Sequence, residues 1–113
     1  MLQRLLGRVE AGRLGRGLAG LRLGWQMQCL YRGEGGIRGT VTYGGARGRK
    51  QYLVELRFTG RGARASCSCL DWQTRQQPCK HIAFAAAYEM GYAAECRSRH
   101  RAVPQVGGIG RGA

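Results

Sequence analysis

The sequence has little proline, few acidic residues and no long apolar run. Two prolines in 113 residues exclude a collagen-like or polyproline composition. No apolar stretch approaches the roughly 18–20 residues that a membrane-spanning helix needs. Paired carboxylates, a phosphate-binding P-loop and a Ser–His–Asp set are also missing, so we expect a protein that is not an enzyme. The length suits one domain and little more.

Arginine and glycine are in excess instead. The chain has 19 Lys and Arg against six Asp and Glu, a formal net charge of +13, and only Lys50 and Lys80 are lysines. Glycine accounts for 20 of the 113 residues. A chain of this composition buries little apolar surface, so we expect a cross-link or metal to stabilise its fold. The arginine excess suits bidentate phosphate contacts, or a G+C-rich genome or hot habitat.

Three of the five cysteines lie near a histidine in the pattern C-x-C-x9-C-x-H, formed by Cys67, Cys69, Cys79 and His81. Three thiolates and one imidazole are the ligands of a closed, tetrahedral, structural zinc site. The alternatives are a redox pair, a catalytic Cys–His dyad and a catalytic zinc. The one-residue spacing disfavours the redox pair, and a full set of protein ligands leaves no position for water. We therefore predict one structural Zn²⁺.

The local spacing of the ligands agrees with this interpretation. Residues i and i+2 of a strand point to the same face, so Cys67 and Cys69 can both approach one ion. The same spacing inside a helix would separate two side chains, so we expect Cys79 and His81 at an irregular helix entry. Pro78 supports that entry, because proline is tolerated in the first turn of a helix.

The remaining cysteines, Cys29 and Cys96, have no partner at ligand spacing, and we expect both to serve packing. An odd number of cysteines and a start without an apolar signal region argue against a secreted disulfide framework. We expect an intracellular protein of the cytoplasm, nucleoid or nucleus. The Arg-rich amphipathic start leaves mitochondrial import as an alternative, although it contains Glu10 and lacks serine.

The segment CSCLDWQTRQQPCKHIAFAAA resembles the SWIM zinc finger, and GRKQYLVELRF looks like the strand that leads into that motif. The resemblance covers about residues 40–92. It implies Cys67, Cys69, Cys79 and His81 as the zinc ligands and short β-strands followed by a helix. It also implies DNA binding and protein–protein contacts. SWIM domains occur in Mutator-type transposases, helicase-like ATPases and partners of recombinase paralogues.

Hydrophobic periodicity predicts an α+β fold: an antiparallel β-meander of three to four strands, followed by a helix and preceded by an amphipathic helix. Glycine turns separate the strands. Trp25, Met27, Cys29 and Tyr31 are expected on one face of the first strand. The predicted strands are residues 25–31, 37–43, 51–58 and 63–69, and the predicted helices are 1–24 and 79–90.

The element pattern also predicts three parts of the chain. These are a basic amphipathic segment (1–24), a SWIM-like zinc-binding domain (25–96) and a mobile basic Gly/Arg tail (97–113). Gly91 is the expected C-cap of the second helix. Trp72, in the loop between the ligand pairs, is expected to pack over the metal site.

The positive charge avoids the zinc segment. Residues 32–64 have eight cations and two acids, whereas residues 65–96 have a net charge of −1. Glycine turns let cations approach a phosphate backbone closely. We therefore expect nucleic acid, preferably DNA, as the partner, and neither a membrane nor a small-molecule substrate. The predicted contacts are Arg47, Arg49, Lys50, Arg61 and Arg64, together with the basic termini. The alternative is an adaptor that docks a larger DNA-processing protein, such as a recombinase-like ATPase.

Overall fold

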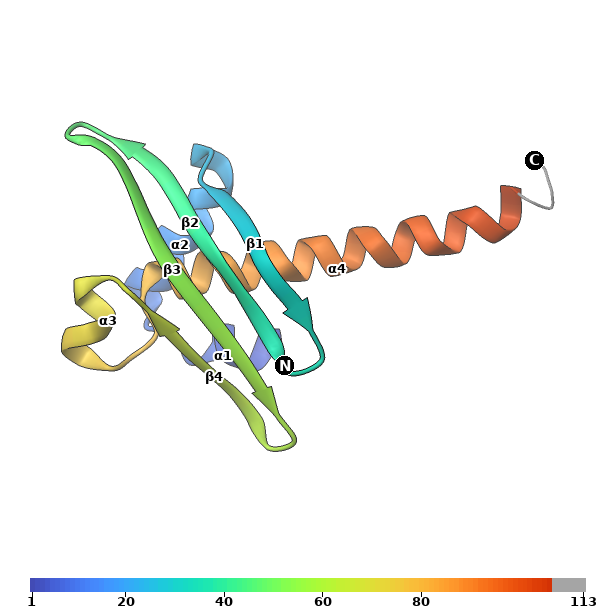
Figure 1. Ribbon diagram of the computed structural model, residues 1–113, viewed down its shortest axis with the longest axis horizontal. Coiled ribbons are helices and arrows are strands. Elements are labelled where there is room, and N and C mark those ends of the chain that lie inside the picture. The colour runs from blue at the N-terminus through green and yellow to red at the C-terminus, as the bar shows by residue number, and fades with distance from the viewer. Residues whose placement is uncertain (107–113) are drawn as a thin grey trace.

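The computed structural model describes the backbone of residues 1–106 and the side chains of residues 1–99 (Figure 1). A four-stranded sheet is preceded in the chain by two N-terminal helices and followed by a short helix and a long C-terminal one, so the predicted α+β class is confirmed. The elements are α1 (Leu2–Gly7), α2 (Ala11–Leu23), β1 (Gln26–Gly33), β2 (Gly36–Gly45), β3 (Gly48–Thr59), β4 (Gly62–Cys67), α3 (Leu70–Arg75) and α4 (Lys80–Val106).

The sheet is a simple antiparallel meander in the order β1-β2-β3-β4. Alternate side chains of each strand point to opposite faces, and apolar residues occupy one of them. On β3, Val54 and Leu56 are fully buried while Leu53 beside them is 45% exposed. The hairpin between β2 and β3 is longer than predicted, because pairing continues to Gly45 and Gly48.

The helices cover the apolar face of the sheet. The N-terminal half of α4 passes behind the strands, with α1 and α2 beside it (Figure 1). Ile82 and Phe84 of α4 and Leu5 of α1 are fully buried in the core that this packing forms. Within residues 1–106 no element packs on the opposite, polar face of the sheet.

A β-bulge changes the faces of β1. The register shifts between Cys29 and Tyr31, so Tyr31 pairs with Arg38 on the open face. The prediction that Tyr31 shares a face with Cys29 is therefore wrong. The shift turns Arg32 inward, where its guanidinium donates to both carboxylate oxygens of Glu89 on α4 at 2.7 and 2.9 Å. Glu89 is only 2% exposed, so this pair fixes the sheet to the helix.

The N-terminal segment is helical as predicted but forms two helices instead of one. The Glu10 side chain accepts hydrogen bonds from the backbone N–H groups of Gly12 and Arg13 and so caps α2. The buried face of α2 consists of glycines. At Gly17 a Cβ would lie 2.5 Å from the Lys80 carbonyl oxygen, and at Gly20 a Cβ would lie 2.5 Å from the Trp25 ring. Glycine here permits close packing of α2 on α4 and on Trp25.

The long helix α4 corrects two expectations. It does not end at Gly91 but continues to Val106, so residues 97–106 are helical rather than a mobile tail. The rest of the predicted tail, 107–113, lies outside the described residues. A further correction concerns the loop between the ligand pairs, which contains the short helix α3. No helix in the described part of the chain is both long enough and apolar enough to cross a membrane.

Candidate metal centre

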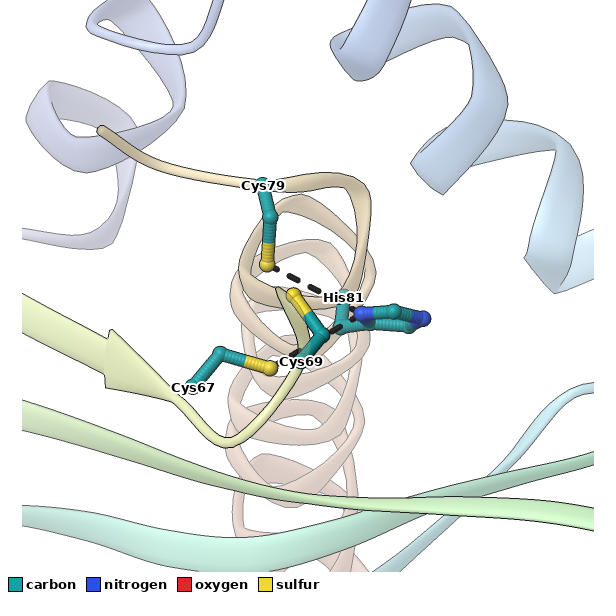
Figure 2. Close-up of side chains that lie close together, drawn as sticks. All are labelled: Cys67, Cys69, Cys79 and His81. Carbon is teal, nitrogen blue, oxygen red and sulfur yellow. Dashed lines mark hydrogen bonds between the residues drawn. The ribbon is translucent and has the colours of Figure 1, made fainter. Parts of the chain in front are cut away.

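The metal centre forms where the end of β4 meets the start of α4. Cys67 is the last residue of β4, and Cys69 lies beyond the strand as the N-cap of α3. The expectation that both lie on one strand is therefore wrong for Cys69. Cys79 immediately precedes α4 and His81 lies in its first turn. Figure 2 shows the four side chains converging from these segments.

Local hydrogen bonds hold the two ligand pairs in place. Pairing with β3 continues one residue past Cys67, because the backbone N–H of Ser68 donates to the Leu53 carbonyl at 3.0 Å. The Cys69 sulfur accepts from the Trp72 backbone N–H at 3.4 Å. After α3, Gln76 adopts a left-handed conformation with φ 57°. This turn ends α3 and directs the chain back to Cys79.

The distances among the donor atoms suit one tetrahedral ion. The three sulfurs and one histidine nitrogen all lie within 4.8 Å of one another. The Nδ1 atom of His81 lies 3.7 Å from the Cys67 sulfur and 3.8 Å from the Cys79 sulfur. Around a zinc ion with bonds of about 2.3 Å, neighbouring sulfurs lie about 3.8 Å apart. All four residues are buried, and their chemistry fits one structural Zn²⁺.

The second nitrogen of His81 is held by a tyrosine. Its Nε2 atom lies 2.9 Å from the Tyr43 hydroxyl. With Nδ1 directed at the sulfurs, Nε2 carries the proton and donates it to that hydroxyl. Burial raises the pKa of Tyr43 to about 12, so the phenol stays neutral and can accept. An outer hydrogen bond of this kind fixes the ring orientation of a metal-binding histidine.

The thiols are strongly perturbed in this buried site. A hydrogen bond from Cys67 lowers the pKa of Cys79 to about 4. The pKa of Cys67 is raised, because it shares its proton with Cys79 and is itself buried. Burial also raises the pKa of Cys69. Several thiolates in one buried site repel one another, and a divalent cation removes that repulsion.

Aromatic rings enclose the histidine. Tyr52 stacks on His81 with ring centroids 4.1 Å apart, and Trp25 stacks on Tyr43 at 4.2 Å. Trp25 can reach this position because Gly24 ends α2 with φ 83°. Trp72 packs against the buried core, which includes the three cysteine ligands. The pattern of the sequence did not reveal Tyr43 and Tyr52 as supports of His81.

A comparison with protein families identifies the segment that contains this centre. Residues 52–89 match the SWIM zinc finger family. The SWIM segment thus spans about a third of the chain and includes all four ligands. The resemblance and the zinc site predicted from the sequence are confirmed. Among curated proteins and solved structures, no match to the chain is found.

The remaining cysteines lie apart from the SWIM ligands. Cys29 is half-buried on β1, and Cys96 is exposed on α4. Neither joins the donor cluster among the described residues. A packing role is therefore wrong for Cys96.

The five predicted nucleic-acid contacts are exposed, but they fall into two groups. Arg47, Arg49 and Lys50 lie at the start of β3 and the turn before it. Arg61 lies in the turn after β3, and Arg64 lies on β4 next to it. Since a strand rises about 3.3 Å per residue, the two ends of β3 are roughly 35 Å apart. Figure 1 shows these turns at opposite ends of the sheet.

Proposed function

We propose that the protein is a zinc-stabilised SWIM module that binds nucleic acid, preferably DNA, and catalyses no reaction. The proposal rests on the net charge of +13, together with the absence of ion pairs at the five predicted contact residues among the described side chains. Among the described side chains, none of the five predicted cations forms an ion pair. Unpaired surface cations attract polyanions and release counterions from phosphates.

Phosphate contact is favoured over base stacking. Tyr43 and Tyr52 are occupied in the aromatic packing around His81 and so are unavailable for stacking on bases. Between the two cationic ends of β3, the open sheet face carries further arginines, Arg38 and Arg57. A span of roughly 35 Å corresponds to about one turn of B-form DNA. The module would therefore contact the phosphate backbone of a DNA duplex along the open face of the sheet.

The ligand set and the thiols support the other parts of the proposal. Three cysteines and one histidine complete a four-coordinate zinc, which leaves no position for a reacting water. None of the five cysteines forms a disulfide in the structure. Free thiols persist in reducing compartments, so we place the protein inside the cell, in the cytoplasm, nucleoid or nucleus.

Fluorescence anisotropy titrations of labelled duplex DNA, single-stranded DNA and RNA at rising salt test the proposal. Replacement of Arg49 and Arg61 by Gln should weaken binding and flatten the slope of log K against log salt by about 0.9 for each phosphate contact removed. The variant Gln51→Ala, on the same strand and also exposed, is the control and should bind as the wild type. Absence of binding at low salt contradicts the proposal.

A second candidate function, an adaptor for a larger DNA-processing protein, is favoured by an exposed leucine stripe. Leu14, Leu18 and Leu21 follow helical spacing on α2, and the last two are 40% and 48% exposed. The glycine face of α2, not this stripe, packs on α4. Exposed apolar stripes often mark protein contacts.

The adaptor candidate is tested with a double variant of the stripe. Leu18→Gln with Leu21→Gln should abolish a stoichiometric protein complex that survives nuclease treatment. Leu23→Gln, on the same helix but off the stripe, should leave that complex intact. If the protein stays monomeric in the presence of candidate partner proteins and binds DNA without them, the result argues for the first function.

A further inference from the structure

A cleft of about 360 Å³ opens beside the SWIM metal centre. Three separate elements supply cations to its wall: Arg13 and Arg16 come from α2, Lys50 from β3 and Lys80 from the start of α4. The floor includes Cys69, Cys79 and His81, together with Tyr43 and Tyr52. The only acidic residue in the lining is Asp71.

Asp71 does not neutralise this cluster. Its carboxylate accepts from Arg13 at 2.8 and 3.0 Å and from Arg75 at 2.9 Å. These arginines hold the pKa of Asp71 well below its usual range. Arg16, Lys50 and Lys80 form no ion pair with any described side chain. Three cations therefore face one cleft without a counter-charge from a carboxylate.

The negative charge of the metal centre offsets part of the positive charge of the cleft but not all of it. Zinc with three thiolates and a neutral imidazole has a net charge of −1. The lining has four cations against Asp71, so an excess of two positive charges remains after the centre is included. The N-terminus of α4, a helix of 27 residues, adds its positive dipole end at Lys80. Cations from separate elements that converge on one cleft are suited to a compact anion.

We propose that this cleft binds one phosphate group, held by Arg16, Lys50 and Lys80. The phosphate comes either from a nucleic-acid backbone or from free phosphate or pyrophosphate. If the phosphate belongs to a nucleic acid, the inference rests on the proposed function and adds a specific phosphate-binding site beside the zinc. The volume lies near the lower end of the range for small-ligand sites. Because Lys80 lies between two zinc ligands in the sequence, a bound phosphate also contacts the segment that the zinc holds.

Zinc-loaded, full-length protein is titrated with inorganic pyrophosphate and, separately, with duplex DNA. The test variant is Arg16→Gln with Lys80→Gln. The control is Arg22→Gln, which removes an exposed arginine from α2 outside the cleft. Removal of two charged groups from the cleft should weaken binding by about 10-fold or more, whereas the control should change it by less than about 2-fold.

The two titrations separate the sources of the phosphate. Cleft-dependent binding of pyrophosphate supports the inference with a free phosphate as ligand. If the wild type binds DNA but not pyrophosphate, and the double variant binds DNA more weakly, the inference is supported with a backbone phosphate as the ligand. If DNA is not bound but pyrophosphate is bound in the cleft, the proposed function fails and this inference stands.

Binding of both ligands by the double variant at the strength of the control overturns the inference, and DNA binding by the wild type then still upholds the proposed function. No binding of either ligand by the wild type overturns both. Zinc content and melting temperature are measured for every variant. If the Lys80 change releases zinc, the single variant Arg16→Gln, which lies away from the ligands in the sequence, decides the matter by the same comparison.

Discussion

At the residue scale, His81 links the metal centre to the sheet. Its Nδ1 lies among the sulfurs, and its Nε2 meets the hydroxyl of Tyr43 on β2. Tyr43 in turn stacks on Trp25, which follows α2. One imidazole therefore connects the start of α4, the sheet and the N-terminal helices. The zinc site is built into the core rather than attached to its surface.

We predict that Tyr43→Phe weakens zinc binding about 10-fold or more, because the ring keeps its packing while Nε2 of His81 loses its acceptor. Competition with a chromophoric chelator measures the affinity. Tyr88→Phe removes the hydroxyl of a tyrosine that is 36% exposed elsewhere on α4, and it is the matched control. Equal zinc affinities for both variants would show that the hydroxyl does not support the ligand.

We predict that Cys79→Ala loses stoichiometric zinc and most of its folded structure. The free energy of zinc binding is part of the free energy of folding in small domains of this kind. The matched control is Cys29→Ala, which removes a thiol outside the cluster. Zinc content by atomic absorption and circular dichroism after chelation measure the effect. A cooperative melt that is unchanged by a chelator is the result that contradicts this expectation.

The four ligands could be found from the sequence because their spacing and chemistry are local. The role of Tyr43 could not, since it depends on how α4 packs against β2. The same holds for Asp71, whose partner Arg13 is 58 residues away in the chain. Residue types close together in sequence reveal a ligand set, but its outer supports come from tertiary packing.

At the element scale, β2 and β3 follow the period-two pattern closely, whereas the helices depart from the sequence signals. Gly91 was expected to stop α4, yet an internal glycine costs only about 1 kcal/mol relative to alanine. Contacts on both sides of Gly91 offset that cost. Glu89 holds Arg32, and the Arg32 guanidinium lies 3.8 Å from the centroid of the Tyr92 ring. Local stop signals were thus outweighed by contacts with β1.

The bulge in β1 was also beyond the reach of the sequence pattern. Strict alternation places Arg32 on the open face, away from Glu89 of α4. The buried carboxylate needs a partner, and the extra residue at Leu30 turns Arg32 toward it. The pairing of these two residues, 57 positions apart, decides the local geometry.

The glycines of α2 allow a prediction with opposite signs on one helix. Gly17→Ala should destabilise the protein by about 1–3 kcal/mol, because its Cβ would lie 2.7 Å from the Ala83 Cβ and closer to the Lys80 carbonyl. Gly15→Ala should stabilise it by up to about 1 kcal/mol, since a Cβ there would meet no atom of another element within 4 Å. Denaturant titrations of the zinc-loaded variants measure both. Equal effects at the two positions would contradict the packing of α2 on α4.

At the scale of the whole molecule, stability and charge reside in different parts. The core lies between the sheet and the first half of α4, whereas residues 94–99 of α4 are exposed. Figure 1 shows the C-terminal half of α4 projecting beyond the sheet. The sequence predicted the division of charge between a near-neutral zinc segment and basic flanks, but it placed Arg97, Arg99 and Arg101 on a mobile tail instead of on α4.

Removal of residues 99–113 tests whether the two properties are separable. The deletion removes three arginines (Arg99, Arg101 and Arg111) and no buried side chain of the described part of the chain. It also breaks the exposed ion pair between Arg99 and Glu95, and exposed pairs of this kind contribute little to stability. The melting temperature and zinc content should therefore stay unchanged.

If the arginines contact phosphates, the slope of log K against log salt for duplex DNA should flatten by up to about 2.7. The full-length variant with the same three arginines changed to Gln should show the same slope, because charge and not length determines it. A lower melting temperature would instead assign a structural role to the end of α4, and an unchanged slope would exclude this terminus from the contacts.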